Sequence, residues 1–301
     1  MKKAITLLLW LSLLSGAFAQ RVETVYRNPA DSTWNSYRVT YPEGPIRGIV
    51  FISYASLTDT ALATQLGFLH VSAVPGKDYF DTMFDDRILE TTDEMLGELC
   101  RQHHVLPGKV ILGGFSAAGT MAVRYAQYCA EGKSKRGIRP AAIFAGDPPL
   151  DYERLWHQAE KSVKLNFHPV AAAEGKSLMD SMIRRFGGSP QVAQTRYRSE
   201  SPYNFYAEKG GRGYLLGKTP LRLYTEPDVH WWMENRRKDY YDLNAMDCAG
   251  LVNELRIQGS STAELITTTD KGYRPDGTRH PHSWSIMDEK DLMAWCLRRL
   301  E

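Results

Sequence analysis

Three residue types that together perform acyl transfer occur in one order along the chain. Ser116 lies in Lys109-Val-Ile-Leu-Gly-Gly-Phe-Ser-Ala-Ala-Gly119, where an apolar run changes directly into a helix-like pattern. Asp228 follows a second apolar run, and His282 lies near the C-terminus, two residues after His280. A serine hydroxyl attacks a carbonyl carbon when a histidine accepts its proton and a carboxylate orients that histidine. The sequence therefore predicts Ser116 as nucleophile, His282 as base and Asp228 as acid.

The neighbours of Ser116 are small, and the geometry of a sharp strand-to-helix turn explains why. A serine at the apex of such a turn has strained backbone, and side chains two residues before and after it would collide. Gly114 and Ala118 avoid that collision. The N–H of Ala117, at the start of the helix, would point to a developing oxyanion. Ala118 departs from the pattern Gly-x-Ser-x-Gly, so an ordinary strand-to-helix turn stays an alternative.

Two other carboxylates compete with Asp228 for the role of acid. Asp147, in Phe144-Ala-Gly-Asp-Pro-Pro149, also follows a predicted strand, and Glu226 is closer to its own strand than Asp228 is. We expect Asp228, because a carboxylate after the penultimate strand would lie beside the loop that delivers the histidine. Its place between Ser116 and His282 is also the chain order of a known arrangement of the three groups.

The histidines leave a metal site as an alternative. His280, His282 and His230 would give three imidazoles, and three imidazoles can bind zinc. The sequence has no helical His-Glu-x-x-His, however, and its cysteines show no metal-ligand spacing. We therefore expect neither a metal nor a cofactor. His280 also remains an alternative base.

Short apolar runs alternate with helical patterns along most of the chain. This alternation is typical of parallel strands joined by crossover helices, so the predicted fold class is α/β, with a mostly parallel central sheet and flanking helices. The predicted strands are Val39–Tyr41, Gly48–Ser53, Phe68–Val74, Val110–Leu112, Ala141–Ala145, Leu221–Thr225 and Ala263–Thr267. The predicted helices are Asp59–Leu66, Asp86–His103, Ala117–Cys129, Tyr241–Gln258 and Ile286–Leu300.

The segment from about 151 to 217 interrupts this alternation with polar, helix-prone sequence. Because sheet elements flank it on both sides, it reads as an insertion into a single domain of residues 20–301. The loops that leave the carboxyl ends of parallel strands surround the ligand crevice, so we expect a helical cap over Ser116. Some of its aromatic residues should then face the pocket, although they could instead pack against the flank of the domain: Trp156, Phe167, Phe186, Tyr203 and Phe205.

With these motifs, the chain resembles a secreted member of the α/β-hydrolase superfamily, in the style of serine esterases and prolyl-oligopeptidase-type peptidases. Gly113-Gly-Phe-Ser-Ala-Ala-Gly119 is similar to their nucleophile elbow. The resemblance implies the roles given above to Ser116, Asp228 and His282. It also implies a second oxyanion donor on the loop after the third strand, which here would be the N–H of Tyr54 or a neighbour. The chain lacks the His-Gly-Gly-Gly form of that loop.

The stretch after Asp228 is rich in aromatic and basic residues. Its aromatic side chains could line a substrate pocket, and Arg236 or Arg237 could hold a substrate carboxylate. The same residues could instead pack under a loop, with the arginines in solvent. The aromatic residues are Trp231, Trp232, Tyr240 and Tyr241.

The N-terminus has the pattern of a secretory signal. Met1-Lys-Lys3 is basic, an apolar run too short to span a bilayer follows, and Ala17-Phe-Ala19 fits a signal-peptidase site before Gln20. Gln20 speaks against a lipid anchor, which needs a cysteine at that position. We expect residues 1–19 to be a signal peptide and the mature chain to be periplasmic or secreted, without membrane contact after cleavage.

Composition bounds the partners. The 301 residues include 37 Lys and Arg against 35 Asp and Glu, and removing Lys2 and Lys3 leaves 35 against 35. A neutral chain without a basic stripe is not expected to bind nucleic acid. Four cysteines are too few for a disulfide framework. Cys100 and Cys129 could form a bridge between neighbouring helices, or all four could be buried thiols.

Together these residues predict an exported serine hydrolase that acts on a small ester or short peptide substrate. A carboxylic ester hydrolase that forms an acyl-enzyme is preferred. A prolyl-oligopeptidase-like peptidase stays open, and so does a protein of this fold that only binds a ligand, because fold alone does not give activity.

Overall fold

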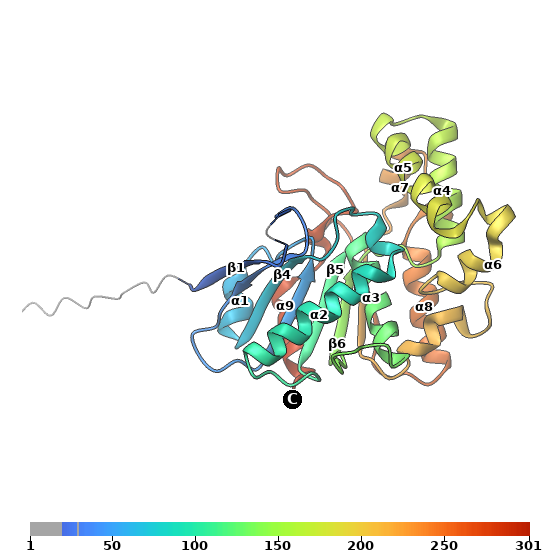
Figure 1. The fold of residues 1–301 in the computed structure, drawn as a ribbon. Helices are drawn as coiled ribbons and strands as arrows, with labels where there is room; N and C mark the ends of the chain where they lie inside the picture. Colours follow the sequence, from blue (N-terminus) through green and yellow to red (C-terminus); the bar gives the residue numbers. More distant parts are fainter. Residues whose placement is uncertain (1–19, 29) are drawn as a thin grey trace, which may run out of the picture.

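Eight strands form one sheet in the computed structural model, which describes residues 20–28 and 30–301 (Figure 1). The order is β1-β2-β4-β3-β5-β6-β7-β8; β2 is antiparallel to both of its neighbours, β1 and β4, and the other neighbouring pairs are parallel. The predicted signal peptide, 1–19, lies outside the described residues. The strands are β1 (Val22–Tyr26), β2 (Ser36–Thr40), β3 (Gly48–Ser53), β4 (Phe68–Val74), β5 (Val110–Phe115), β6 (Ala142–Gly146), β7 (Leu221–Thr225) and β8 (Ala263–Thr267).

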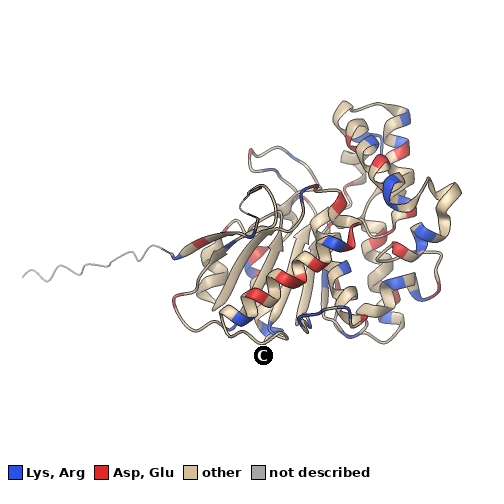
Figure 2. Ribbon diagram, in the orientation of Figure 1, with Lys and Arg blue, Asp and Glu red and all other residues tan. Residues whose placement is uncertain are grey.

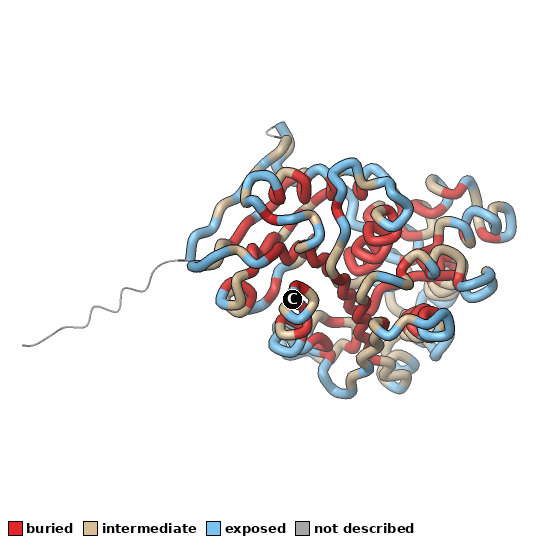
Figure 3. The backbone as a smooth tube through the Cα atoms, turned by 90° about the horizontal axis from the view of Figure 1, so that it is seen from below, coloured by how far each residue is buried: buried red, intermediate tan, exposed pale blue. Residues whose placement is uncertain are grey.

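Helices cover both faces of this sheet. Strand β5 shows the division: Val110 and Leu112 join the core on one face, and Ile111 joins the core on the other, as the two-residue period of a strand requires. The first face is covered by α2 (Asp86–Gln102), α3 (Ala117–Ala130) and α8 (Ala245–Ile257), and the second by α1 (Thr60–Gln65) and α9 (Glu289–Arg298). Figure 3 shows the resulting buried layer through the middle of the molecule.

The predicted fold class is confirmed. Strands β3, β4, β7 and β8 have the predicted bounds. The helix predicted from Tyr241 begins at Ala245, after a short 3-10 turn. The sequence prediction missed β1, an edge strand whose residues are alternately exposed and half-buried, and it missed α7 (Val229–Arg236), whose hydrophobic residues follow no helical period.

Three further helices lie between β6 and β7: α4 (Tyr152–Leu165), α5 (Pro169–Phe186) and α6 (Pro190–Glu200). Figure 1 shows α4 and α5 close to α7 at one end of the molecule. Their large aromatics form a separate core in which Trp156 packs against Tyr197, and Phe186 packs against both Tyr197 and Phe84. These rings therefore stabilise the helices against each other.

Lys and Arg positions are interspersed with Asp and Glu positions along the ribbon (Figure 2). Within the part of the chain that the structure describes, no helix combines the length and hydropathy needed to cross a membrane. Cys100, Cys129, Cys248 and Cys296 are free thiols, so the structure shows no bridge between Cys100 and Cys129.

Candidate active site

Ser116 occupies the turn between β5 and α3. Its backbone has φ 55° and ψ −125°, a conformation that costs a non-glycine residue on the order of 1–3 kcal/mol. Two backbone hydrogen bonds hold it there: its N–H donates to the Gly146 carbonyl at 2.8 Å, and its carbonyl accepts from the Thr120 N–H at 3.0 Å. The hydroxyl makes no capping bond to the helix, so it is available for reaction.

The small residues around Ser116 are where the turn needs them. A Cβ atom on Gly114 would lie 2.5 Å from the carbonyl carbon of Ala118, and one on Gly113 would lie 2.0 Å from the Phe144 ring. The backbones before and after the serine therefore approach too closely for any side chain at 114. Ala118 is itself buried without disturbing the turn, so alanine is accommodated where the common pattern has glycine.

The carboxylate that contacts the histidine belongs to Asp147. Its Oδ2 lies 2.6 Å from Nδ1 of His282. The expected acid, Asp228, is wrong by this geometry: its carboxylate pairs with Arg279 at 2.6 Å and caps α7 by accepting the Trp231 N–H at 3.0 Å. Asp147 follows β6 and Asp228 follows β7, and these two strands are neighbours. The sequence therefore named an acid one strand away from the one that meets the imidazole.

The surroundings of Asp147 fix the direction of its carboxylate. The residue has a left-handed backbone, with φ 44°, and its N–H donates to the Tyr224 carbonyl at 2.7 Å. The Thr225 hydroxyl donates to Oδ1 at 3.0 Å, which leaves Oδ2 for His282. The Asn244 side chain donates to the Asp147 carbonyl at 2.9 Å. These contacts give the imidazole one orientation, with Nδ1 towards the acid.

Glu226 and Asp228 anchor the loop that carries His282. Arg279, on that loop, contacts Glu226 at 2.5 Å and Asp228 at 2.6 Å. Glu226 also accepts from the Thr268 hydroxyl and from the N–H groups of Lys271 and Gly272, at 2.8 to 3.0 Å. Although burial acts to raise the pKa of Glu226, these hydrogen bonds lower it below its ordinary value. Glu226 is therefore a charged anchor of this loop, and its carboxylate oxygens are taken up by Arg279, Thr268, Lys271 and Gly272.

His280 supports the loop and does not take the place of His282. Its Nδ1 lies 2.9 Å from the His282 carbonyl, and its ring packs edge-on against Trp231 and Trp232. Burial lowers the pKa of His280 to about 4, so it is neutral at pH 7. His230 is exposed. Among residues 20–28 and 30–301, no three metal-ligating side chains gather into a group that could hold a metal ion.

The two residues expected as oxyanion donors, Ala117 and Tyr54, differ in how the structure places their N–H groups. Ala117 begins α3 beside the serine, as expected. The Tyr54 N–H is not available, because it donates to the Ala73 carbonyl at 2.7 Å. A residue that the sequence prediction missed, Tyr79, lies there instead: its hydroxyl donates to the Phe115 carbonyl at 3.1 Å.

The Tyr79 hydroxyl lies directly at the elbow. Burial raises its pKa, and hydrogen bonds from Ser116, Ala118 and Ala117 act in the opposite direction. Tyr54 supports it, because its ring packs edge-on against Tyr79 at 5.4 Å. Tyr79 follows β4, whose carboxyl end lies on the same edge of the sheet as Ser116. The position of Tyr79 shortly after a predicted parallel strand was the sequence signal that could have indicated its place near Ser116.

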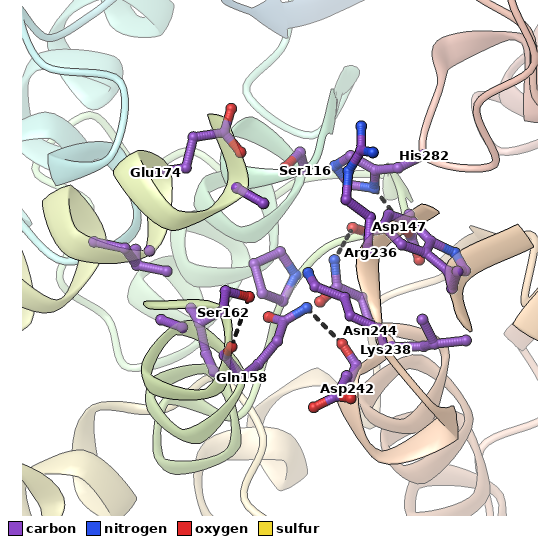
Figure 4. Close-up of a pocket in the computed structure, with 18 of the residues that line it drawn as sticks. Ser116, Asp147, Gln158, Ser162, Glu174, Arg236, Lys238, Asp242, Asn244 and His282 are labelled. Carbon is purple, nitrogen blue, oxygen red and sulfur yellow. Dashed lines mark hydrogen bonds and ion pairs between the residues drawn. The ribbon is translucent and has the colours of Figure 1, made fainter. Parts of the chain in front are cut away.

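Ser116, Asp147 and His282 line one cavity of about 340 Å³. Figure 4 shows the Ser116 side chain beside the His282 ring, with Asp147 behind that ring. Helices α4 and α5 supply one wall through small, aliphatic and polar side chains. The prediction that cap aromatics face the pocket is wrong: none of the five lines the cavity. The wall residues from the two helices are Leu155, Gln158, Ala159, Ser162, Val170, Ala171, Glu174, Gly175 and Leu178.

The stretch after Asp228 contributes only part of what the sequence suggested. Trp232 and Arg236 line the cavity, together with Lys238. Tyr240 and Tyr241 are exposed. Arg237 is exposed and lies over the Phe167 ring, so of the two arginines only Arg236 reaches the site.

No family model matches the chain, and no curated protein matches it by sequence. Solved structures do match. A prolyl endopeptidase superposes with a TM-score of 0.56 at 15% identity over 93% of this chain and 38% of its own. An esterase of the bacterial hormone-sensitive lipase family gives 0.52 at 15% identity, over 93% and 84%. The acylaminoacyl peptidase of Pyrococcus horikoshii gives 0.54 at 12% identity, over 86% and 37%.

The chain thus spans less than two fifths of the two peptidases and most of the esterase. All three similarities are at 15% identity or less, so they concern the fold. The chain therefore has the α/β-hydrolase fold.

Proposed function

We propose that this protein is an exported serine hydrolase that cleaves a small carboxylic ester through an acyl-enzyme. The observation that carries the proposal is the convergence of three groups in one cavity: a strained serine at a helix start, an imidazole, and a carboxylate 2.6 Å from that imidazole. Strain of this kind persists where surrounding structure enforces it and clusters at active sites.

The residues define the steps. Asp147 accepts a hydrogen bond from Nδ1–H of His282. The other ring nitrogen, Nε2, is therefore free to accept the proton of the Ser116 hydroxyl. The serine oxygen forms a bond to the ester carbonyl carbon, and the protonated imidazole then gives its proton to the departing alcohol. Water, deprotonated by the same nitrogen, attacks the acyl-enzyme and releases the carboxylic acid. One ester and one water become one acid and one alcohol.

Two donors serve the oxyanion in this proposal. The first is the Ala117 N–H at the start of α3, where the helix dipole also favours negative charge. The second is the Tyr79 hydroxyl, which turns from the Phe115 carbonyl to the substrate oxygen. Its raised pKa keeps it protonated and able to donate at neutral pH.

An ester is favoured over a peptide by the size of the cavity. About 340 Å³ is near the lower limit of ligand sites and holds a small molecule. The structural likeness to a prolyl endopeptidase keeps peptide cleavage as the second candidate. The predicted signal peptide at 1–19 supports export to the periplasm or beyond.

A fluorophosphonate probe tests the nucleophile without knowledge of the substrate. We expect the mature protein to be labelled, peptide mapping to place the adduct on Ser116, and Ser116→Ala to abolish labelling. Absence of labelling in the folded wild-type protein would favour the ligand-binding alternative. Matched panels of 4-nitrophenyl esters and peptide 4-nitroanilides then decide between ester and peptide cleavage.

A further inference from the structure

Three basic side chains line the same cavity as Ser116: Arg236, Lys238 and Arg274. Four acidic side chains also line the cavity, and three of them already contact a basic or imidazole side chain. Asp147 contacts His282, Glu226 contacts Arg279 at 2.5 Å, and Asp242 contacts Lys161 at 2.5 Å.

The exception among the acids is Glu174. Among residues 20–28 and 30–301, it forms no ion pair, and neither do the three basic side chains. Among the described residues, none of the three cations therefore has a carboxylate within ion-pairing distance. A cation in a cavity without such a partner is costly unless a ligand or solvent compensates its charge.

Arg236 and Lys238 are set in aromatic surroundings that limit their movement. The guanidinium of Arg236 lies 5.3 Å from the centre of the Trp231 ring, and the Lys238 ammonium lies 5.2 Å from that of Trp232. Arg236 and Lys238 are among the cavity-lining side chains labelled in Figure 4, together with Ser116, Asp147 and His282. Burial lowers the pKa of Lys238 to about 8, which is the electrostatic cost of an ammonium without a close counter-ion.

We propose that the substrate carries a carboxylate, which Arg236 and Lys238 bind while the ester carbonyl lies at Ser116. This inference rests on the proposed function and names its substrate class: an ester with an anionic acyl or alcohol half. A guanidinium binds a carboxylate through two parallel hydrogen bonds, and an ammonium adds a point charge. A neutral ester of similar size gives neither cation an anionic partner and is the poorer substrate.

Pairs of esters with and without a carboxylate test this. For the acyl side, mono-(4-nitrophenyl) adipate is compared with 4-nitrophenyl hexanoate. For the alcohol side, 4-acetoxybenzoate is compared with 4-acetoxybenzamide. Spontaneous hydrolysis is subtracted with Ser116→Ala. We expect kcat/KM for the anionic member of at least one pair to exceed that of its neutral partner by about tenfold or more at low salt. The preference should shrink as ionic strength rises.

Variants assign the preference to residues. Arg236→Gln and Lys238→Met should each lower the anionic-to-neutral ratio of kcat/KM by about tenfold, mainly through the KM of the anionic ester. Arg237→Gln is the matched control, because Arg237 is adjacent in sequence yet exposed and outside the cavity. Its ratio should equal that of the wild type. Fluorophosphonate labelling of each variant reports that its site is still folded.

The two proposals fail separately. If wild-type protein is not labelled and hydrolyses no ester, the serine hydrolase proposal is wrong. If it is labelled and hydrolyses neutral esters as fast as anionic ones, or if Arg237→Gln lowers the ratio as much as Arg236→Gln, the carboxylate site is wrong and the hydrolase proposal stands.

Discussion

The carboxylate of Asp147 lies 2.6 Å from the imidazole of His282, although 135 positions separate the two residues in the chain. Parallel strands produce this meeting, because β6 delivers Asp147 and the segment after β8 delivers His282 to the same edge of the sheet. Arg279 neutralises the competing carboxylates of Glu226 and Asp228. Glu226 and Asp228, which are nearer to His282 in sequence, therefore anchor its loop. Asp147, which is farther away in sequence, contacts the imidazole itself.

Replacing the acid should separate these roles. We expect Asp147→Asn to lower kcat by about 10⁴, because an amide leaves the imidazole in the wrong tautomer. Asp228→Asn, which removes one of several contacts to Arg279, should lower kcat by about tenfold or less. Ester turnover of the two purified variants checks the order, and a larger loss in Asp228→Asn than in Asp147→Asn would contradict it.

Removing the Tyr79 hydroxyl should affect the transition state more than the ground state. Tyr79→Phe keeps the ring that packs on Tyr54, and we expect it to lower kcat by about 10²-fold with little change in KM. Tyr241→Phe is the control, because the Tyr241 ring is exposed. Steady-state kinetics on one neutral ester suffice, and an unchanged kcat in Tyr79→Phe would leave Ala117 as the main donor.

The preference for anionic esters should depend on pH through Lys238. Its pKa of about 8 means that the ammonium is charged below pH 8 and loses its charge as the pH rises through that value. Asp242 and Glu174 act to raise this pKa, while Arg154 and Arg236 act to lower it. The anionic-to-neutral ratio should therefore fall between pH 7 and pH 9.5.

The Lys238→Arg variant checks the origin of that fall, because a guanidinium stays charged throughout this range. Its ratio should stay level up to pH 9.5, whereas Lys238→Met should show a low ratio at every pH. A wild-type ratio that does not change with pH would exclude Lys238 as the carboxylate ligand.

The elbow should tolerate no side chain at position 114. A Cβ there would lie 2.5 Å from the Ala118 backbone, so Gly114→Ala should destabilise the fold by about 1–3 kcal/mol and displace Ser116. Ala118→Gly, on the other side of the turn, removes a methyl group and should lower the free energy of unfolding by about 1 kcal/mol. Urea unfolding and fluorophosphonate labelling measure both effects; an active, fully stable Gly114→Ala would show that the turn opens more easily than the contacts indicate.

The sequence predicted the strands well because buried parallel strands are short apolar runs with clear ends. The predicted strand Val110–Leu112 lies within β5 (Val110–Phe115), which ends directly before Ser116. The sequence could not rank Asp147 above Asp228. Both follow strands, and what separates them is a pairing across the fold, in which Arg279 binds Asp228 and Thr225 turns Asp147 towards His282.

Contacts across the fold also explain why the prediction for the cap aromatics was wrong. Trp156 and Phe186 are large apolar residues on helices beside the site, but their helices need a core of their own, and the rings fill it. The cavity wall is left to small and polar residues such as Ser162 and Glu174. Periodicity indicates that a helix has an apolar face without indicating which neighbour that face meets.

The ion pairs of Arg279 connect the segment that carries Arg236 and Lys238 with the loop that carries His282. Glu226 and Asp228 begin the segment that leads through α7 to Arg236 and Lys238. Arg279 forms ion pairs with the same two acids and lies on the loop that carries His282. Exchanging the whole segment from Glu226 through α7 to accept another substrate would therefore also loosen the loop that carries His282. Specificity is better altered by replacing individual side chains on α7 while Glu226 and Asp228 are kept, so that this loop keeps its anchors.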